Sequence, residues 1–233
     1  MFKSLPYICM DGINEKGLCA SLLRVQIKDG EQPARTNWAP GFILRHILDD
    51  CATVEEAVEL VGTSEIKPSD WQDCHIFVTD EMSNSVVLES RGGKLYVVKT
   101  DIVTNFYQCR DDIEDSFYHS GSLREKAVYL ADKSRASRYT IGYGHGYHRF
   151  AAIQSQLEIH LDLTSESYRT VMPEDHALVV LRSAAQNSYT KAVGNSVTQY
   201  TIIYNNTYRT MKAWSFQDYS KSFCFDISGK PLS

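Results

Sequence analysis

Three closely spaced runs of strand-forming residues constrain the fold of this chain more than any other feature. They are His75–Thr79, Ser85–Glu89 and Lys94–Val98, and each is rich in Val, Ile or Leu. Turn-forming segments at 80–84 and 91–93 separate them. Connections this short join antiparallel neighbours, because a parallel pair needs a crossover of a dozen or more residues. The region therefore predicts an antiparallel meander.

A hairpin is predicted ahead of the meander. Tyr7–Met10 and Leu18–Ile27 are two runs of strand-forming residues, and Asp11–Gly12 together with Asn14–Gly17 supply turn residues between them. The pattern predicts that the two runs pair as antiparallel strands.

Helical patterns follow the hairpin. Apolar residues recur at helical intervals over 42–47, and Thr53 with Glu56 forms a capping box, in which the Thr side chain accepts the Glu56 backbone N–H and the Glu side chain reaches back. Three later stretches also predict helices: 122–133, 147–161 and 173–185.

Strand patterns return near the end of the chain, at 198–204, 207–215 and 222–227. No repeat, low-complexity tract or linker interrupts the sequence, so we expect a single domain over residues 1–233. Strands in blocks and helices in blocks are typical of an α+β fold of antiparallel layers.

The charge and hydropathy of the chain argue against two classes of protein, nucleic-acid binders and membrane-spanning proteins. It has 24 Lys and Arg residues against 29 Asp and Glu, a formal charge of −5, and no window holds a basic run. Nucleic-acid binders need clustered positive charge to displace phosphate counterions, so no nucleic-acid partner is expected. No apolar stretch reaches the roughly 20 residues that span a bilayer, and the first residues lack a secretory signal. We expect a cytoplasmic protein without a membrane span.

Six cysteines are scattered along the chain without a C-x-x-C pair: Cys9, Cys19, Cys51, Cys74, Cys109 and Cys224. A chain of this length can bury a core without disulfide staples. We therefore expect free and mostly buried thiols.

The common signatures of nucleotide, dinucleotide, zinc-protease and serine-hydrolase sites are absent from the sequence. His145 and His148 lie three residues apart in a glycine-rich segment, but a metal site needs further ligands that no spacing supplies. We expect neither a metal nor a cofactor.

Two polar residues lie where chemistry could take place. Asn105 follows a predicted strand run at Asp101–Val103, and an amide at a strand end can donate to a developing oxyanion. The residues alone favour the alternative, a turn Asn that satisfies its own backbone. Arg149 follows the glycine-rich segment on the first turn of a predicted helix, where a cation gains nothing from the helix dipole. An Arg at this position either interacts with a group outside its own helix or, as is more common, lies on the solvated surface.

Several segments together resemble one enzyme family. In chain order they are Asp11–Leu18 (D-G-I-N-E-K-G-L), Val103–Phe106, Gly144–Phe150, Ser196–Tyr200 and Ser222–Asp226. This ordered set is similar to the linear amide C–N hydrolases, the choloylglycine hydrolase and penicillin V acylase family of N-terminal nucleophile hydrolases. The first motif is specific, whereas Thr-Asn alone is weak.

The resemblance implies an αββα sandwich of two antiparallel sheets. In such enzymes an N-terminal cysteine attacks an amide carbonyl, its own α-amino group acts as base, and water then hydrolyses the acyl-enzyme. By position, Asn105 matches the Asn that helps hold the oxyanion, and Arg149 matches the Arg beside the nucleophile. Arg24 falls where better-known members have an Asn or Tyr, which makes it a weaker candidate for substrate binding.

The chain departs from the family at its start. In the family the nucleophilic Cys and the strand after it precede the D-G-x-N-E-K-G-L segment, which here begins at residue 11. We therefore expect an N-terminally incomplete domain that lacks its first strands and its nucleophile and is inactive alone. Two alternatives stay open: a non-catalytic relative that binds an acyl or sterol group, and a chain completed by a separate N-terminal segment.

The resemblance leaves the substrate open among small N-acyl amides, because bile salts, penicillin V and other N-acyl amides are cleaved by similar cores. Family members often form tetramers, but no feature of this sequence decides between a monomer and a homo-oligomer.

Overall fold

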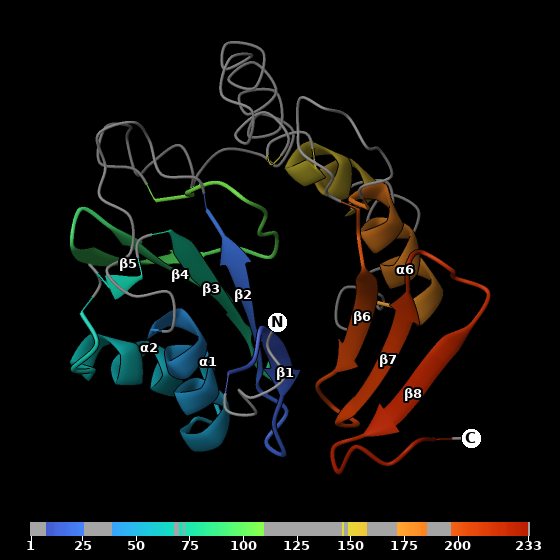
Figure 1. Ribbon diagram of the computed structural model, residues 1–233, viewed down its shortest axis with the longest axis horizontal. Helices are drawn as coiled ribbons and strands as arrows, with labels where there is room; N and C mark the ends of the chain where they lie inside the picture. The colour runs from blue at the N-terminus through green and yellow to red at the C-terminus, as the bar shows by residue number, and fades with distance from the viewer. Residues whose placement is uncertain are drawn as a thin grey trace.

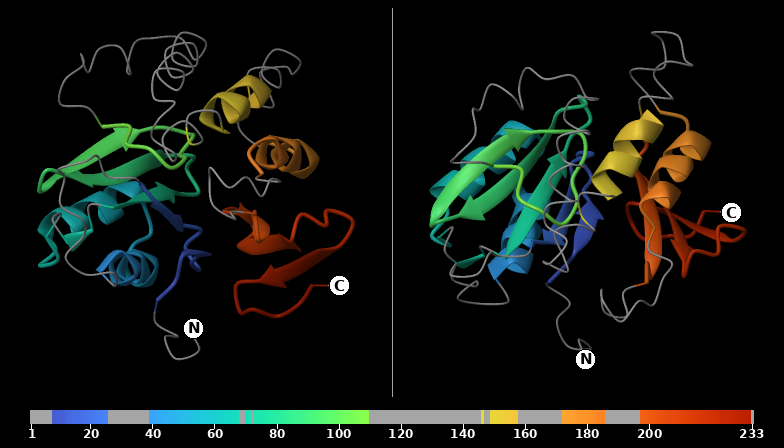
Figure 2. Two further views of the ribbon diagram at one scale, coloured as in Figure 1. Left: turned by 45° about the horizontal axis from the view of Figure 1, so that its top comes forward. Right: turned by 90° about the horizontal axis from the view of Figure 1, so that it is seen from above.

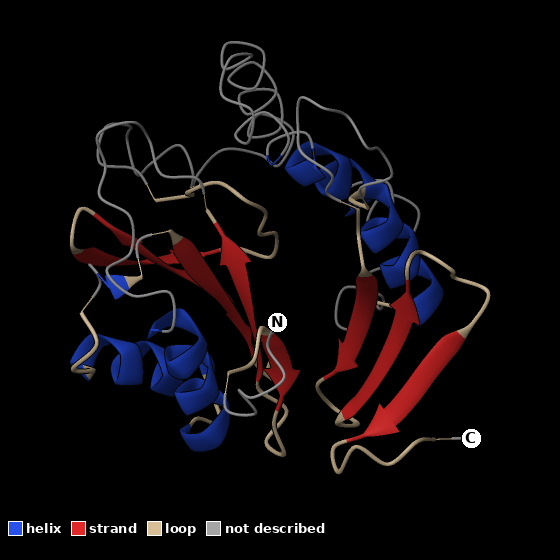
Figure 3. Ribbon diagram, in the orientation of Figure 1, coloured by secondary structure: helices blue, strands red, loops and turns tan. Residues whose placement is uncertain are grey.

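The computed structural model describes residues 8–25, 39–67, 70–71, 73–109, 146, 149–157, 172–185 and 197–232. Over these residues the chain forms two antiparallel sheets (Figures 1 and 3). The larger has the strand order β1-β2-β3-β4-β5 and the smaller the order β6-β7-β8. The strands are β1 Asp11–Ile13, β2 Cys19–Arg24, β3 Cys74–Thr79, β4 Ser85–Arg91, β5 Lys94–Lys99, β6 Tyr200–Asn205, β7 Thr210–Ser215 and β8 Ser222–Asp226.

The helices are α1 Ala39–Asp50, α2 Val54–Thr63 and α6 Glu174–Ser183, with a further helical segment at 149–157. The prediction of an α+β fold with two antiparallel sheets and covering helices is confirmed. The helix predicted at 122–133 lies outside the described residues, as do the His145 and His148 side chains.

The meander forms as predicted. β3 pairs with β4 and β4 with β5, all antiparallel, with His75 opposite Glu89 and Glu89 opposite Tyr96. Gly92 and Gly93 both adopt positive φ at the β4–β5 turn, a conformation that glycine reaches without strain. Successive side chains along each strand point to opposite faces of the sheet.

One face of the larger sheet is covered by α1 and α2 (Figure 1). Its even-numbered strand residues, Ile76, Val78 and Leu88, are fully buried against the apolar stripes of the two helices. The predicted cap of the second helix is present, because Thr53 Oγ1 accepts the Glu56 N–H at 3.2 Å. The Glu56 carboxylate reaches back to the N–H of Ala52.

The first hairpin differs from its prediction. Asp11 and Gly12, expected in the turn, pair with Ser21 and Ala20 inside the sheet, so that the strand begins later than Tyr7–Met10. The buried Asn14 explains why the turn starts later than predicted. Its side chain accepts hydrogen bonds from backbone N–H groups just after Ile13, and these bonds close the turn there.

The Asn14 side chain also joins this turn to the helical layer. Its Oδ1 accepts the N–H groups of Lys16 and Leu18, both at 3.0 Å. Its Nδ2 donates to the carbonyls of Leu48 and Cys51, at 3.0 and 2.7 Å, at the end of α1. One amide therefore satisfies four backbone groups and anchors the D-G-x-N motif.

The smaller sheet lies beside the β1 edge of the larger one, and the views in Figures 1 and 2 agree on this arrangement. The hydroxyl groups of Tyr200 and Tyr204 both donate to the Asp11 carboxylate. Cys19 Sγ lies 3.4 Å from Asn206 Oδ1 in the β6–β7 turn. Polar contacts therefore connect β1 and β2 to β6 and its turn.

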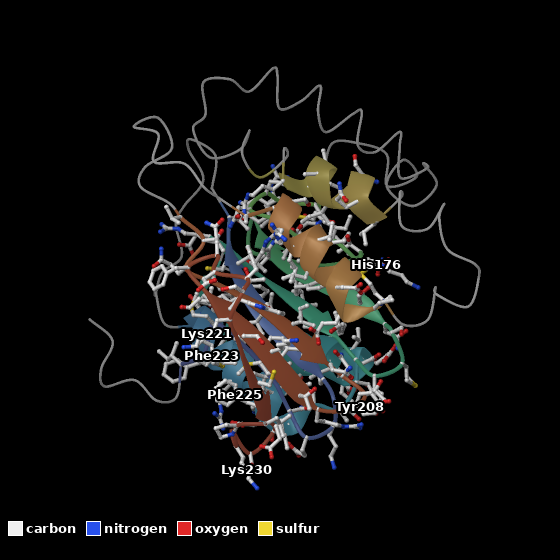
Figure 4. The ribbon with its side chains drawn as sticks, turned by 90° about the vertical axis from the view of Figure 1, so that its right-hand side faces the viewer. His176, Tyr208, Lys221, Phe223, Phe225 and Lys230 are labelled. Atoms are coloured by element: carbon white, nitrogen blue, oxygen red, sulfur yellow. The ribbon has the colours of Figure 1, made fainter. Side chains whose placement is uncertain are left out.

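Helix α6 packs against the smaller sheet through an ion pair between Glu174 and Lys212. By strand alternation, Lys212 lies on the opposite face from Tyr204, because it pairs with Ile203. Figure 4 shows Phe223 and Phe225 along β8, and the Phe223 side chain is 45% exposed. No helix in the described ranges is long and apolar enough to cross a bilayer.

Candidate functional site

Asn105 lies in an irregular segment that follows β5. The strand expected at Asp101–Val103 is absent, because β5 ends at Lys99 and the chain turns there, with Thr100 Oγ1 donating to the Ile102 carbonyl. The prediction that Asn105 ends a strand is therefore wrong. A compact loop carries it instead, which we call the Asn105 loop, residues 102–109.

The Asn105 loop is closed by hydrogen bonds from its own end. The buried Gln108 donates through Nε2 to the Ile102 carbonyl at 2.6 Å. The backbone N–H of Phe106 donates to the Thr104 carbonyl at 3.1 Å. A loop tied in this way holds its central side chain in a defined direction.

A segment more than 40 residues further along the chain packs on this loop. The hydroxyl group of Thr104 donates to the Gly146 carbonyl at 2.9 Å. A Cβ on Gly146 would lie 3.2 Å from the backbone of Asn105, so glycine permits this close approach. Phe106 and Phe150 meet edge to face, with ring centroids 5.5 Å apart.

These contacts bring the predicted site residues together. Arg149 Nη2 donates to Oδ1 of Asn105. Asn105 Nδ2 in turn donates to the backbone carbonyl of Arg24 at 2.7 Å. Because a guanidinium only donates and a carbonyl only accepts, the chemistry of the two partners determines which way the amide faces.

Arg24 joins the site through its backbone. It is the last residue of β2, its side chain is exposed, and it lies opposite Cys74 in the sheet. Arg149 is half-buried, and burial lowers the pKa of its guanidinium, which nevertheless stays protonated at neutral pH. The site therefore carries one fixed cation beside one oriented amide.

None of the six cysteines forms a disulfide, as predicted. Burial raises the pKa of Cys9, and it raises the pKa of Cys19 and of Cys74 to about 12 and that of Cys51 to about 11. A thiol attacks as its thiolate, so these four groups are poorly suited to act as nucleophiles near neutral pH.

A cavity of about 810 Å³ lies between the two sheets. Its lining includes Phe77 and Ser85 of the larger sheet, Ile203 and Asn205 of β6, and Glu174 of α6. The Asn105 loop does not line it, so the cavity and the Asn105–Arg149 pair are separate features of the described chain. Within the described ranges, no group of His, Cys, Asp or Glu side chains could hold a metal ion.

Sequence reasoning missed two residues beside the Asn105 loop, His75 and Glu89. They pair across β3 and β4, are completely buried, and bring Nδ1 and Oε1 within 2.9 Å of each other. A signal was available, since each is an ionisable residue at an inward position of an otherwise apolar strand run.

Residues 1–110 match the family described as linear amide C–N hydrolases, choloylglycine hydrolase family. A search of curated proteins finds no match.

Solved structures resemble the whole described fold. Two variants of conjugated bile acid hydrolase from Clostridium perfringens superpose with TM-scores of 0.65 and 0.63, covering 96% and 97% of this chain and 74% and 77% of theirs. Penicillin V acylase from Agrobacterium tumefaciens superposes with a TM-score of 0.57, covering 95% of this chain and 67% of its own. Each is 16% identical to this chain, so these likenesses show the fold.

Proposed function

Since residues 1–110 belong to the choloylglycine hydrolase family of linear amide C–N hydrolases, we propose that this chain forms the scaffold and the oxyanion side of an amide hydrolase. The observation that carries the proposal is the contact between Arg149 and Asn105 beside the end of β2. The two residues were singled out by their match to the family's motifs, and they touch across 44 positions of sequence.

Asn105 acts as an oxyanion donor. When a thiolate attacks an amide carbonyl, the π electrons move onto the carbonyl oxygen, and N–H donors that already point at that oxygen stabilise the charge. One N–H of the Asn105 amide is engaged by the Arg24 carbonyl, which leaves the second N–H of the same group for a substrate oxygen.

Arg149 keeps the amide in that orientation and supplies positive charge beside the reacting thiol. A rotated Asn105 would bring its NH₂ group against the guanidinium, where two donors oppose each other. Collapse of the tetrahedral intermediate then breaks the C–N bond, the amine leaves with a proton, and water hydrolyses the thioester. The Arg24 side chain, exposed at the end of β2, is a substrate-binding candidate at the rim.

The attacking thiol comes from a strand that pairs with β6. Cys9, Cys19, Cys51 and Cys74 are held as thiols by their raised pKa values, and a cysteine inside a chain has no free α-amine to act as base. Among the described residues, β6 is one of the two edge strands of the smaller sheet and the one beside β1, and edge strands present unpaired backbone groups to a partner strand.

The substrate class is a small N-acyl amide of the conjugated bile salt or penicillin V type, cleaved without a cofactor or metal. The absence of a disulfide among the six cysteines supports a reducing, cytoplasmic compartment. A homo-oligomer would be compatible with this scheme, and so would a separate N-terminal segment that completes the smaller sheet.

Three proteins test the proposal. The first is the 233-residue chain, the second carries a Cys-led β-hairpin ahead of Met1, and the third has Ala in place of that added Cys. Amine release from a conjugated bile salt and from penicillin V is measured for each. We expect turnover by the second protein alone. Turnover by the first protein that an internal Cys→Ala change abolishes would assign the nucleophile elsewhere.

A second candidate function is a non-catalytic relative that binds an acyl or sterol group, and the high thiol pKa values favour it. It is distinguished in the same samples by isothermal titration with a bile salt. Saturable binding by all three proteins, with no amine released by any of them, would select the binding module.

A further inference from the structure

A buried carboxylate holds the end of the Asn105 loop. Glu89 has no solvent exposure, and both of its oxygens accept backbone N–H groups from the loop. The N–H of Gln108 lies 2.9 Å from Oε1 and 3.0 Å from Oε2, and the N–H of Cys109 donates to Oε2. These amides belong to no helix or strand, so the side chain replaces the partners that a sheet would provide.

His75 holds the carboxylate in turn. Its Nδ1 lies 2.9 Å from Glu89 Oε1, and the two residues are directly opposite in the β3–β4 ladder. Among the described residues, His75 Nε2 is buried without a hydrogen-bond partner. A fully buried carboxylate and imidazole are costly to desolvate, and their pairing does not by itself explain a gain in stability over an apolar pair.

The geometry supplies a different reason for the pair. Gln108 and Cys109 come three and four residues after Asn105, and the Gln108 side chain closes the loop onto the Ile102 carbonyl. A loop pinned at both ends can hold the central amide within the few tenths of an ångström that oxyanion stabilisation demands. Where Glu89 holds Gln108 thus affects the position of the loop backbone from which the Asn105 amide extends to Arg149 and the Arg24 carbonyl.

We propose that Glu89, braced by His75, is a positioning residue that orients the Asn105 amide toward the substrate oxygen. The proposal rests on the function proposed above for Asn105. It assigns Glu89 no contact with substrate and no proton transfer. Its effect reaches the reacting atoms only through the backbone N–H groups of Gln108 and Cys109.

The test compares Glu89→Gln with Val78→Ala. Gln keeps the shape of the side chain but replaces one acceptor oxygen with an NH₂ donor, which must face one of the loop amides. Val78 is fully buried on the opposite, helix-covered face, so its truncation destabilises the same sheet without touching the loop. Both variants are studied at a temperature where circular dichroism shows them folded.

The first readout needs no activity. In the 233-residue chain, NMR follows hydrogen exchange at the Gln108 and Cys109 amides and the side-chain NH₂ signals of Asn105. We expect Glu89→Gln to speed exchange at the two amides by about tenfold or more and to shift the Asn105 signals, consistent with the loss of one buried hydrogen bond. Val78→Ala leaves both unchanged. Unaltered protection and unaltered Asn105 signals in Glu89→Gln overturn the proposal.

The second readout uses the protein with the added Cys-led hairpin. Oxyanion stabilisation acts in the transition state, so Glu89→Gln should lower kcat by roughly 10- to 100-fold with KM nearly constant, while Val78→Ala changes neither. A raised KM with constant kcat contradicts the proposal. If no variant hydrolyses any substrate, the proposed function fails, and the exchange measurements still decide the role of Glu89.

Discussion

The Arg149 guanidinium donates to the Asn105 side-chain oxygen, and the same amide donates from its nitrogen to the Arg24 carbonyl. Residues from three separate parts of the chain therefore meet at one side-chain amide. Since both partners have a single hydrogen-bonding role, the amide has one favourable orientation. This relationship makes Asn105 the residue whose replacement is most informative.

Replacing Asn105 by Ala should remove transition-state stabilisation with little loss of fold. We expect kcat of the hairpin-completed protein to fall by about 10²–10³-fold, the effect of deleting one oxyanion donor. Steady-state kinetics and a urea titration measure the two consequences separately. Gln199→Ala is the control, because this exposed amide bonds the Val197 carbonyl within its own segment. Equal kcat values for the two variants would contradict the assigned role.

The two tyrosines on Asp11 should make stability fall in alkali. Burial and the Asp11 carboxylate raise the pKa of Tyr200 to about 12, and they raise that of Tyr204 as well. The folded state therefore retains these protons more tightly than the unfolded chain, whose phenols have a pKa of about 10. The stabilisation is complete below pH 10 and is lost as pH rises through 12.

Urea unfolding at pH 8 and at pH 11 tests this link between the sheets. Tyr204→Phe should be less stable than wild type at pH 8 by about 1 kcal/mol and should lose less stability between the two pH values. Tyr208→Phe, at a side chain that is 76% exposed, should follow wild type. An identical alkaline loss in Tyr204→Phe and wild type would argue against the Asp11 contact.

Asp80, in the β3–β4 turn, should strongly stabilise the packing of α2 on the larger sheet. Burial alone would raise its pKa, but hydrogen bonds from the Asn84 side chain and from the N–H groups of Val54, Asn84 and Met82 hold the pKa below its usual value. The interaction therefore stabilises the fold above about pH 4 and weakens as the pH falls further. Asp80→Asn should cost about 1–3 kcal/mol at pH 7 and show less acid sensitivity.

Denaturant titrations at pH 7 and pH 3 measure both effects of Asp80→Asn. Asp49→Asn provides the matched control, because Asp49 forms an exposed ion pair with Arg45 one turn away on α1. Such pairs contribute about 0–1 kcal/mol. If the two variants cost the same, the Asp80 hydrogen bonds do not hold α2 on the β3–β4 turn.

The folded chain should protect Cys19 from alkylation. With a pKa of about 12, Cys19 should react with iodoacetamide at pH 8 roughly 10³-fold more slowly than an ordinary thiol of pKa about 8.5. Mass spectrometry of tryptic peptides, with and without urea, measures the ratio. Rapid modification of Cys19 in the folded chain would restore it as a candidate nucleophile.

The amino-acid sequence determined the elements whose signals are local. The period-two runs of the meander, the helical stripe before Asp50 and the Thr53 cap follow from contacts within a few residues, and each forms where it was predicted. Asp11 was misread as a turn residue, because its place in the sheet depends on Asn14 closing the turn after it.

The tertiary structure decided the site. Asn105 alone is indistinguishable from a turn residue, and Arg149 alone from a surface cation. Their contact depends on Gly146 and Phe150 packing against the loop from more than 40 residues away. The sequence marks Glu89 as an ionisable residue in an apolar strand run, but only the tertiary structure shows that its carboxylate pairs with His75 and accepts the Gln108 N–H. Long-range contacts of this kind leave no period in a sequence, since they depend on where whole elements pack and not on the spacing of neighbours.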